Sequence, residues 1–188
     1  MINEALTYTV KRLNEFFAPT ADPVVFGNIA FAQDGSSDNS PMSKKVVVSL
    51  INIQQDRMSQ DPLPYKYQGT NVYVQQPAVN LNLYLLISAN YDDYGTALTA
   101  IDKVIEFFQY TRYFGSDNAP DLPAGLDRLI FDMFSVDLDL VHHLWSMLGS
   151  KYMPSVVYKM RMISIQHQED QRAPAPLITK ISTKENIL

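Results

Sequence analysis

The stretch that decides the fold is residues 80–109, NLNLYLLISANYDDYGTALTAIDKVIEFFQ. Its first ten residues alternate in a way typical of a strand, with one face made of Leu81, Leu83, Leu85, Ile87 and Ala89. The residues that follow change to the helical period, and Asp92 and Asp93 lie where a helix N-terminus favours acidic side chains. We therefore expect a strand over 80–89 and a helix over 92–110, with a buried stripe of Tyr94, Ala97, Leu98, Ile101, Val104, Ile105 and Phe108.

The flanking sequence adds further elements. The pattern predicts an amphipathic helix over 2–17, strands over 24–31, 46–53 and 155–165, and a short helix over 138–148 that ends at Gly149. Residues 54–76 are expected to be irregular except at Asn71–Val74, and Arg128–Val136 fits a helix or a strand equally well. Together the elements predict an α+β fold, in which a mixed, mainly antiparallel sheet is packed by two longer helices and one short helix.

Length and composition indicate one globular domain followed by an arm. The chain has 188 residues, of which 46% are hydrophobic, and this suits a single core. We expect this domain over residues 1–165. Residues 166–188 are polar and interrupted by proline, so we expect an extended or flexible C-terminal arm there. The apolar residues of this arm are Leu177, Ile178, Ile181, Ile187 and Leu188. They suit the addition of a strand to a neighbouring sheet, and a disordered arm fits the same sequence equally well.

Charge and residue usage exclude several classes of protein. The net charge of −5 provides no basic footprint for nucleic acid, and no apolar run reaches the roughly 20 residues that span a bilayer. The absence of cysteine and of a signal-peptide pattern favours the cytoplasm. Acidic residues gather between Gly115 and Leu140, where they suit turns and helix caps or an acidic face for a basic partner: Asp117, Asp121, Asp127, Asp132, Asp137 and Asp139.

No set of residues has the pattern of an active site. His142 and His143 are adjacent, so on a helix their side chains point about 100° apart and do not converge on one metal. Asp137 and Asp139 suit helix capping at least as well as cation binding. The glycines form no phosphate-binding loop. We therefore expect no enzyme, no cofactor and no metal. A hydrolase or metal enzyme built on these four side chains is the alternative.

Four segments carry a resemblance to a known family. They are MINEALTYTVKRLNEFF at 1–17, VVVSLINI at 46–53, the stretch 80–109, and LWSMLGSKYMPSVVYKMRMISI at 144–165. In this order, and across nearly all of residues 1–165, the chain resembles the N-terminal domain family of contractile injection system tail terminator (cap) proteins. These proteins belong to phage tail-like particles of the antifeeding-prophage and virulence-cassette type. The resemblance also favours a strand at Arg128–Val136.

The resemblance implies a structural role in assembly. Such proteins are expected to form a hexameric ring that closes the distal end of the inner tube and the surrounding sheath, without catalysis. The implied partners are further copies of the chain and the sheath and tube proteins. Besides the apolar arm residues, the candidate partner-binding residues are Lys159 and Arg161, which point away from the face shared by Val156, Tyr158 and Met160; the same two cations also fit a solvated surface. An adaptor for cargo or baseplate parts of such a particle is the alternative function.

Overall fold

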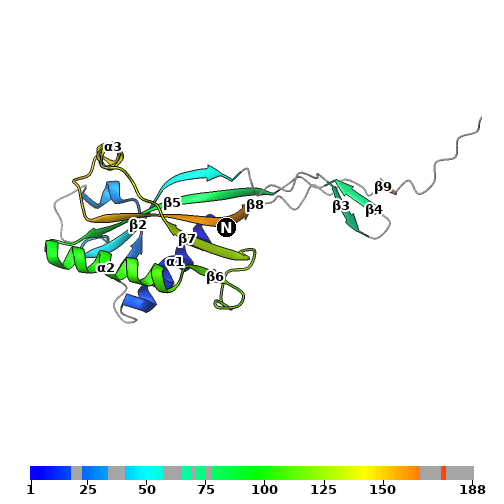
Figure 1. Ribbon diagram of the computed structural model, residues 1–188, viewed down its shortest axis with the longest axis horizontal. Helices are drawn as coiled ribbons and strands as arrows, with labels where there is room; N and C mark the ends of the chain where they lie inside the picture. The colour runs from blue at the N-terminus through cyan, green and yellow to red at the C-terminus, as the bar shows by residue number, and fades with distance from the viewer. Residues whose placement is uncertain are drawn as a thin grey trace, which may run out of the picture. The chain divides into compact units, whose positions relative to one another are not determined.

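The computed structural model describes residues 1–17, 23–33, 41–56, 65–68, 71–74, 78–165 and 175–176. The chain divides into two compact units (Figure 1). The first unit comprises Met1–Gln55 and Leu81–Ile163, and the second comprises Asp56–Asn80 and Ser164–Leu188. The expected division into a domain over 1–165 and an arm over 166–188 stays a prediction.

The first unit contains all the helices of the described residues and most of the strands. Its helices are α1 (Ile2–Phe17), α2 (Tyr94–Tyr110) and α3 (Leu138–Leu148), with a short 3-10 turn η1 (Ile29–Gln33). Its strands are β1 (Val24–Phe26), β2 (Lys45–Gln55), β5 (Val79–Asn90), β6 (Tyr113–Gly115), β7 (Arg128–Met133) and β8 (Ser155–Ile165). The α+β prediction with two longer helices and one short helix is confirmed, and Arg128–Met133 forms a strand.

The six strands make one mixed sheet in the order β1-β2-β5-β8-β7-β6. β1 runs parallel to β2, whereas β2 and β5, β7 and β8, and β6 and β7 pair in antiparallel fashion. The Ala89 N–H donates to the Pro154 carbonyl at 2.9 Å, which brings the start of β8 beside the end of β5. The long strands β2, β5 and β8 thus form the centre, and the two edges are strands of only three residues, β1 and β6.

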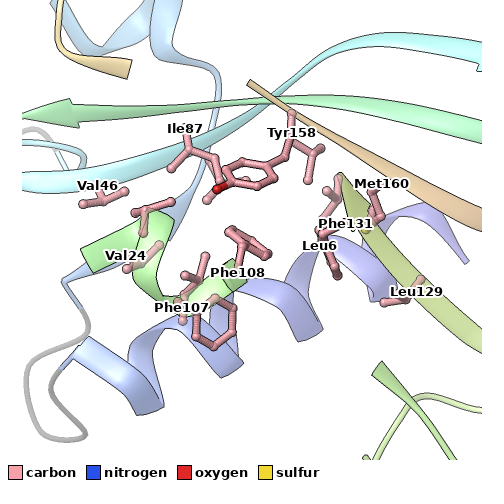
Figure 2. Close-up of a cluster of buried hydrophobic side chains, with 14 of the residues drawn as sticks. Leu6, Val24, Val46, Ile87, Phe107, Phe108, Leu129, Phe131, Tyr158 and Met160 are labelled. Atoms are coloured by element: carbon pink, nitrogen blue, oxygen red, sulfur yellow. The ribbon is translucent and has the colours of Figure 1, made fainter. Parts of the chain in front are cut away.

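One face of this sheet is covered by α1 and α2 (Figure 1). The side chains between the layers form the larger core, which contains Leu6 and Leu13 of α1 and the alternating residues Leu83, Leu85 and Ile87 of β5. Figure 2 shows how side chains of the two helices and of the strands point toward one another in this layer. The expected inward face of the 80–89 strand is confirmed, because alternation directs every second residue of a strand to one side.

The opposite face carries α3 and η1, with a second, smaller core. Trp145 is buried there, while Val141, Leu144 and Leu148 pack against it in partly buried positions. Val47 of β2 and Leu86 of β5 complete this core from the sheet. α3 ends at Gly149, whose φ of 65° is the left-handed conformation that commonly terminates a helix.

Two expectations about the extent of strands were wrong. The strand predicted over 24–31 ends at Phe26, because the Ser49 hydroxyl of β2 donates to the Gly27 carbonyl at 2.7 Å and accepts from the Ile29 N–H at 3.1 Å. These two bonds direct the chain into η1. Residues 54–76 are also less irregular than expected, since Tyr65–Gln68 forms a strand.

The buried stripe of α2 is rotated from the one expected. Tyr94 and Leu98 are exposed, and the buried residues are Ala97, Ala100, Ile101, Val104, Phe107 and Phe108. The rotation arises because α2 contacts two neighbours. The Phe107 ring lies 5.4 Å from Phe16 of α1, whereas the Phe108 ring lies 4.4 Å from Tyr158 of the sheet.

The second unit contains a small sheet of three strands, in the order β3-β4-β9. β3 (Tyr65–Gln68) and β4 (Asn71–Val74) pair in antiparallel fashion. β9 (Ala175–Pro176) adds to β4 opposite Asn71 and Val72. Residues that belong to the predicted arm therefore contribute a strand to the chain's own second sheet.

Candidate interaction surface

Lys159 and Arg161 lie on the sheet face that carries α3, opposite the core filled by Tyr158 and Met160, as the alternation of β8 predicts. Arg161 Nη2 lies 2.7 Å from the Asp132 carboxylate of β7, so this cation is already paired within the sheet. Lys159 Nζ lies 6.0 Å from the centroid of the Tyr84 ring, within range of a cation–π interaction. We call this side of the sheet, together with α3, the α3 face.

An open apolar groove of about 560 Å³ runs along the α3 face between α3 and the strands. On the sheet side it is lined by Tyr84, Phe134 and Val157, and the rings of Tyr84 and Phe134 meet edge to face at 5.2 Å. On the helix side it is lined by Leu140, Leu144 and Met147. Met147 is 73% exposed and Leu140 53% exposed, so α3 presents apolar side chains to solvent as well as to its core.

Sequence reasoning missed this groove, although a signal for it was present. In LDLVHHLWSML, apolar residues occur on more of the helix surface than one buried stripe needs, and Leu140, Leu144 and Met147 repeat at helical spacing. A short helix with two apolar faces indicates that one of them meets something other than its own core. The groove therefore has the composition of a contact surface.

Two of the acidic residues after Gly115, Asp117 and Asp121, accept hydrogen bonds from other side chains. The Asp121 carboxylate accepts hydrogen bonds from the Tyr8 hydroxyl at 3.0 Å and from Lys11 Nζ at 2.8 Å, which ties this loop to α1. The bonds from Lys11 and Tyr8 lower the pKa of Asp121, and burial together with the Asp121 bond raises the pKa of Tyr8 to about 12. Asp117 accepts from the Tyr113 hydroxyl at 2.6 Å. These contacts support the interpretation of Asp117 and Asp121 as turn residues.

The alternative catalytic or metal-binding residues all belong to α3 or its start. Asp137 is the N-cap residue without a side-chain cap bond, and Asp139 lies in the first turn. The rings of His142 and His143 lie 5.9 Å apart with an angle of 55° between their planes. In the parts of the chain that the structure describes, no group of three or more His, Asp or Glu side chains is placed to hold a metal ion.

The remaining candidate residues belong to the arm. Leu177, Ile178, Ile181, Ile187 and Leu188 lie outside the described residues. Within the described part of the arm, Ala175–Pro176 forms β9. None of the helices in the described ranges is long and apolar enough to cross a bilayer.

Two solved structures have a fold similar to that of this chain. The chain aligns over its full length with 65% of the sheath/tube terminator of an extracellular contractile injection system, PVC, in the extended state, with a TM-score of 0.66 and 13% identity. It also aligns over 98% of its length with 60% of the tube-terminating cap of the anti-feeding prophage, with a TM-score of 0.63 and 14% identity. The chain thus has a tail-terminator-like fold and spans somewhat less than two thirds of each of these proteins.

The sequence itself assigns the family. The model of the Pvc16 N-terminal domain matches residues 3–179, and the chain therefore belongs to the Pvc16 N-terminal domain family. A search of curated proteins found no match. The resemblance inferred from the four sequence segments is confirmed.

Proposed function

We propose that this chain is a tail terminator, or cap, that closes the distal end of the tube and sheath of a contractile injection system. The observation that carries the proposal is the match of the whole chain, at TM-scores of 0.66 and 0.63, to a sheath/tube terminator and a tube-terminating cap. The family match over residues 3–179 supports it independently, because it rests on sequence.

The function we infer works through shape. A terminator must bind the last layer of a cylinder on one side and offer no equivalent site on the other. We propose that copies of the chain meet through heterologous contacts that close into a ring, which we expect to be hexameric. Stable contacts of this kind bury more than about 1,000 Å² each. The role requires no catalysis, no cofactor, no nucleic acid and no insertion into a membrane, and assembly would take place in the cytoplasm.

The exposed apolar side chains of the α3 face support a role in contacts with other proteins. We propose that Lys159 and Arg161 lie at such a contact, and that residues 166–188 act as an arm whose apolar residues, Leu177 to Leu188, reach a neighbouring subunit. Residues 1–165 would then form the body of the terminator.

Deletion of the gene tests the proposed function. Particles that lack a terminator should have sheaths and tubes of irregular length, and labelled protein should be found at the end opposite the baseplate. Purified protein should form six-fold rings in negative-stain images, and a tagged copy should purify with sheath and tube proteins. Particles of normal, uniform length after deletion would refute the proposal, and a label at the baseplate would favour an adaptor.

Charge reversal tests the proposed contact residues. Lys159→Glu and Arg161→Glu should reduce the amount of sheath and tube protein that purifies with a tagged copy. Lys103→Glu is the matched control, because Lys103 is an exposed cation of α2 on the opposite side of the sheet, over the ring of Phe17. Equal recovery of sheath and tube with all three variants would remove Lys159 and Arg161 from the interface.

A further inference from the structure

The two edges of the six-stranded sheet share a feature that the terminator role does not require. Edge strands present unpaired backbone N–H and C=O groups, and these are a template for pairing with another chain. In this sheet the edge strands are β1 and β6. In each of them, an asparagine side chain occupies backbone groups that a further strand would use.

At the β1 edge the residue is Asn14 of α1. The Val46 N–H donates to the Pro23 carbonyl at 2.8 Å, and the Gly27 N–H donates to the Val48 carbonyl at 3.1 Å. The backbone groups of Pro23 and Gly27 therefore face β2. Because alternate residues of a strand direct their backbone groups to opposite sides, the groups of Val24 point outward. The Val24 N–H donates to Asn14 Oδ1 and Asn14 Nδ2 donates to the Val24 carbonyl, both at 2.8 Å.

The Asn14 amide therefore makes the same pair of bonds that a residue of an antiparallel neighbour would make. In an antiparallel ladder, two directly opposed residues exchange both of their N–H···O bonds. A primary amide has one donor side and one acceptor side in a plane, as the backbone has. A strand approaching β1 would have to displace this amide.

At the β6 edge the residue is Asn118, in the turn after the strand. The Phe131 N–H donates to the Arg112 carbonyl at 2.9 Å, so Arg112 faces β7 and the groups of Tyr113 and Gly115 point outward. The Gly115 N–H donates to Asn118 Oδ1 at 2.8 Å, and Asn118 Nδ2 donates to the Tyr113 carbonyl at 2.9 Å.

The turn is shaped to bring Asn118 onto this edge. The Gly115 carbonyl accepts from the Ala119 N–H at 2.8 Å, which occupies a third outward group. A Cβ on Gly115 would lie 2.8 Å from Oδ1 of the Asp117 side chain, whose other oxygen accepts from the Tyr113 hydroxyl, so a larger residue at position 115 would displace this carboxylate. The chain thus folds back over β6 at the point where the sheet ends.

We propose that Asn14 and Asn118 close the six-stranded sheet against strand addition by a second copy of this chain. A single asparagine that bonds to nearby backbone is common in turns. Here an asparagine amide makes two bonds to outward backbone groups at both ends of one sheet: Asn14 of a helix bonds to Val24, and Asn118 of a turn bonds to Tyr113 and Gly115. Contacts between copies of the first unit then form through its faces. This proposal about the sheet edges is independent of the proposed function, because it concerns the first unit whether or not the chain closes the end of a tube.

Amide hydrogen exchange on the unmodified protein is the first test. The Val24 and Gly115 amides should exchange at least about a hundred-fold more slowly than unprotected amides, because each donates to an asparagine at an otherwise open edge. Exchange of either amide at the rate of an unprotected amide would overturn the proposal for that edge. This measurement needs no variant.

Substitution is the second test. Asn14→Leu and Asn118→Leu keep a similar side-chain volume and remove both bonds, so two outward backbone groups become available at each edge. The variants should associate beyond the species that the wild type forms, with an affinity at least about ten-fold higher in sedimentation velocity. Asn90→Leu is the matched control: Asn90 Nδ2 donates to the Met42 carbonyl at 2.9 Å from β5, an interior strand.

The outcomes separate the proposal from a merely structural role. Folded Asn14→Leu and Asn118→Leu variants that sediment like the wild type at every concentration would overturn it, and so would equal association of Asn90→Leu. Circular dichroism establishes whether each variant is folded. If a variant does not fold, the exchange rates of the unmodified protein decide the matter for its edge.

Discussion

Replacing Phe108 with alanine should be among the most destabilising single changes in the first unit. Phe108 is 3% exposed and lies at the centre of the larger core (Figure 2). Its ring centroid lies 4.4 Å from Tyr158, 4.8 Å from Phe131 and 5.0 Å from Phe107. The side chain thus joins α2 to two strands of the sheet.

The expected loss of unfolding free energy is about 4 kcal/mol. Phe→Ala changes in cores cost roughly 3–5 kcal/mol, since the lost transfer free energy is added to the cost of the cavity. Ring pairs contribute about 0.5–1.5 kcal/mol beyond burial, so the three partner rings keep the loss for Phe108→Ala away from the low end of the roughly 3–5 kcal/mol range. For a chain of this length, about 4 kcal/mol corresponds to a fall in Tm of roughly 8–16 °C.

Urea unfolding followed by circular dichroism, at one fixed protein concentration, measures the loss. Tyr110→Ala is the matched control, because Tyr110 is an aromatic residue of the same helix that is 86% exposed, and its loss should stay within about 0.5 kcal/mol. If Phe108→Ala costs less than about 1.5 kcal/mol with an unchanged denaturant slope, α2 does not pack on the sheet as described.

Three further changes test other parts of the first unit. Gly149→Ala should cost about 1 kcal/mol in urea unfolding, because φ is 65° there although open space surrounds the position; an unchanged midpoint would argue against the left-handed end of α3. Because the pKa of Asp121 is lowered, its carboxylate stabilises the fold at a pH above the ordinary carboxyl pKa, and this stabilisation is lost as the pH falls below about 5. Asp121→Asn should therefore lose less stability than the wild type on acidification. Parallel curves of stability against pH for the two proteins would contradict this. The pKa of Tyr8 is raised from 10.0 to about 12, so its protonated hydroxyl stabilises the fold at a pH below 10.0, and this stabilisation is lost as the pH rises toward 12. Tyr8→Phe should therefore show a shallower alkaline decline of the urea midpoint than the wild type. An equally steep decline in both proteins would assign the loss to other groups.

The surroundings of Lys159 and Arg161 show what the alternation of a single strand does not predict. The alternation of 155–165 predicts that Lys159 and Arg161 point away from the core, and the structure places them there. Their partners within the sheet, Asp132 and Tyr84, come from β7 and β5, which are distant in sequence from β8. Whether a cation is paired depends on which strands become neighbours.

The asparagines at the sheet edges show the same limit. Asn14 lies on the polar side of a helix pattern and Asn118 in a turn-forming stretch, and local sequence explains both positions without any reference to a sheet. Their shared arrangement becomes visible only once β1 and β6 are known to be the outer strands.

The amino-acid sequence by itself determined the positions of the three helices and of the long strands β2, β5 and β8, and the inward face of the 80–89 strand. These properties follow from periodicity over neighbouring residues, which is local information. Tertiary structure decided the strand order, the end of β1 at Phe26, the rotation of α2 and the surroundings of Arg161. Each of these four features depends on a bond or a ring contact between residues separated by at least 20 positions in the sequence. Examples are the bond between Gly27 and Ser49 and the ring contact between Phe108 and Tyr158. No local sequence pattern encodes such a pair.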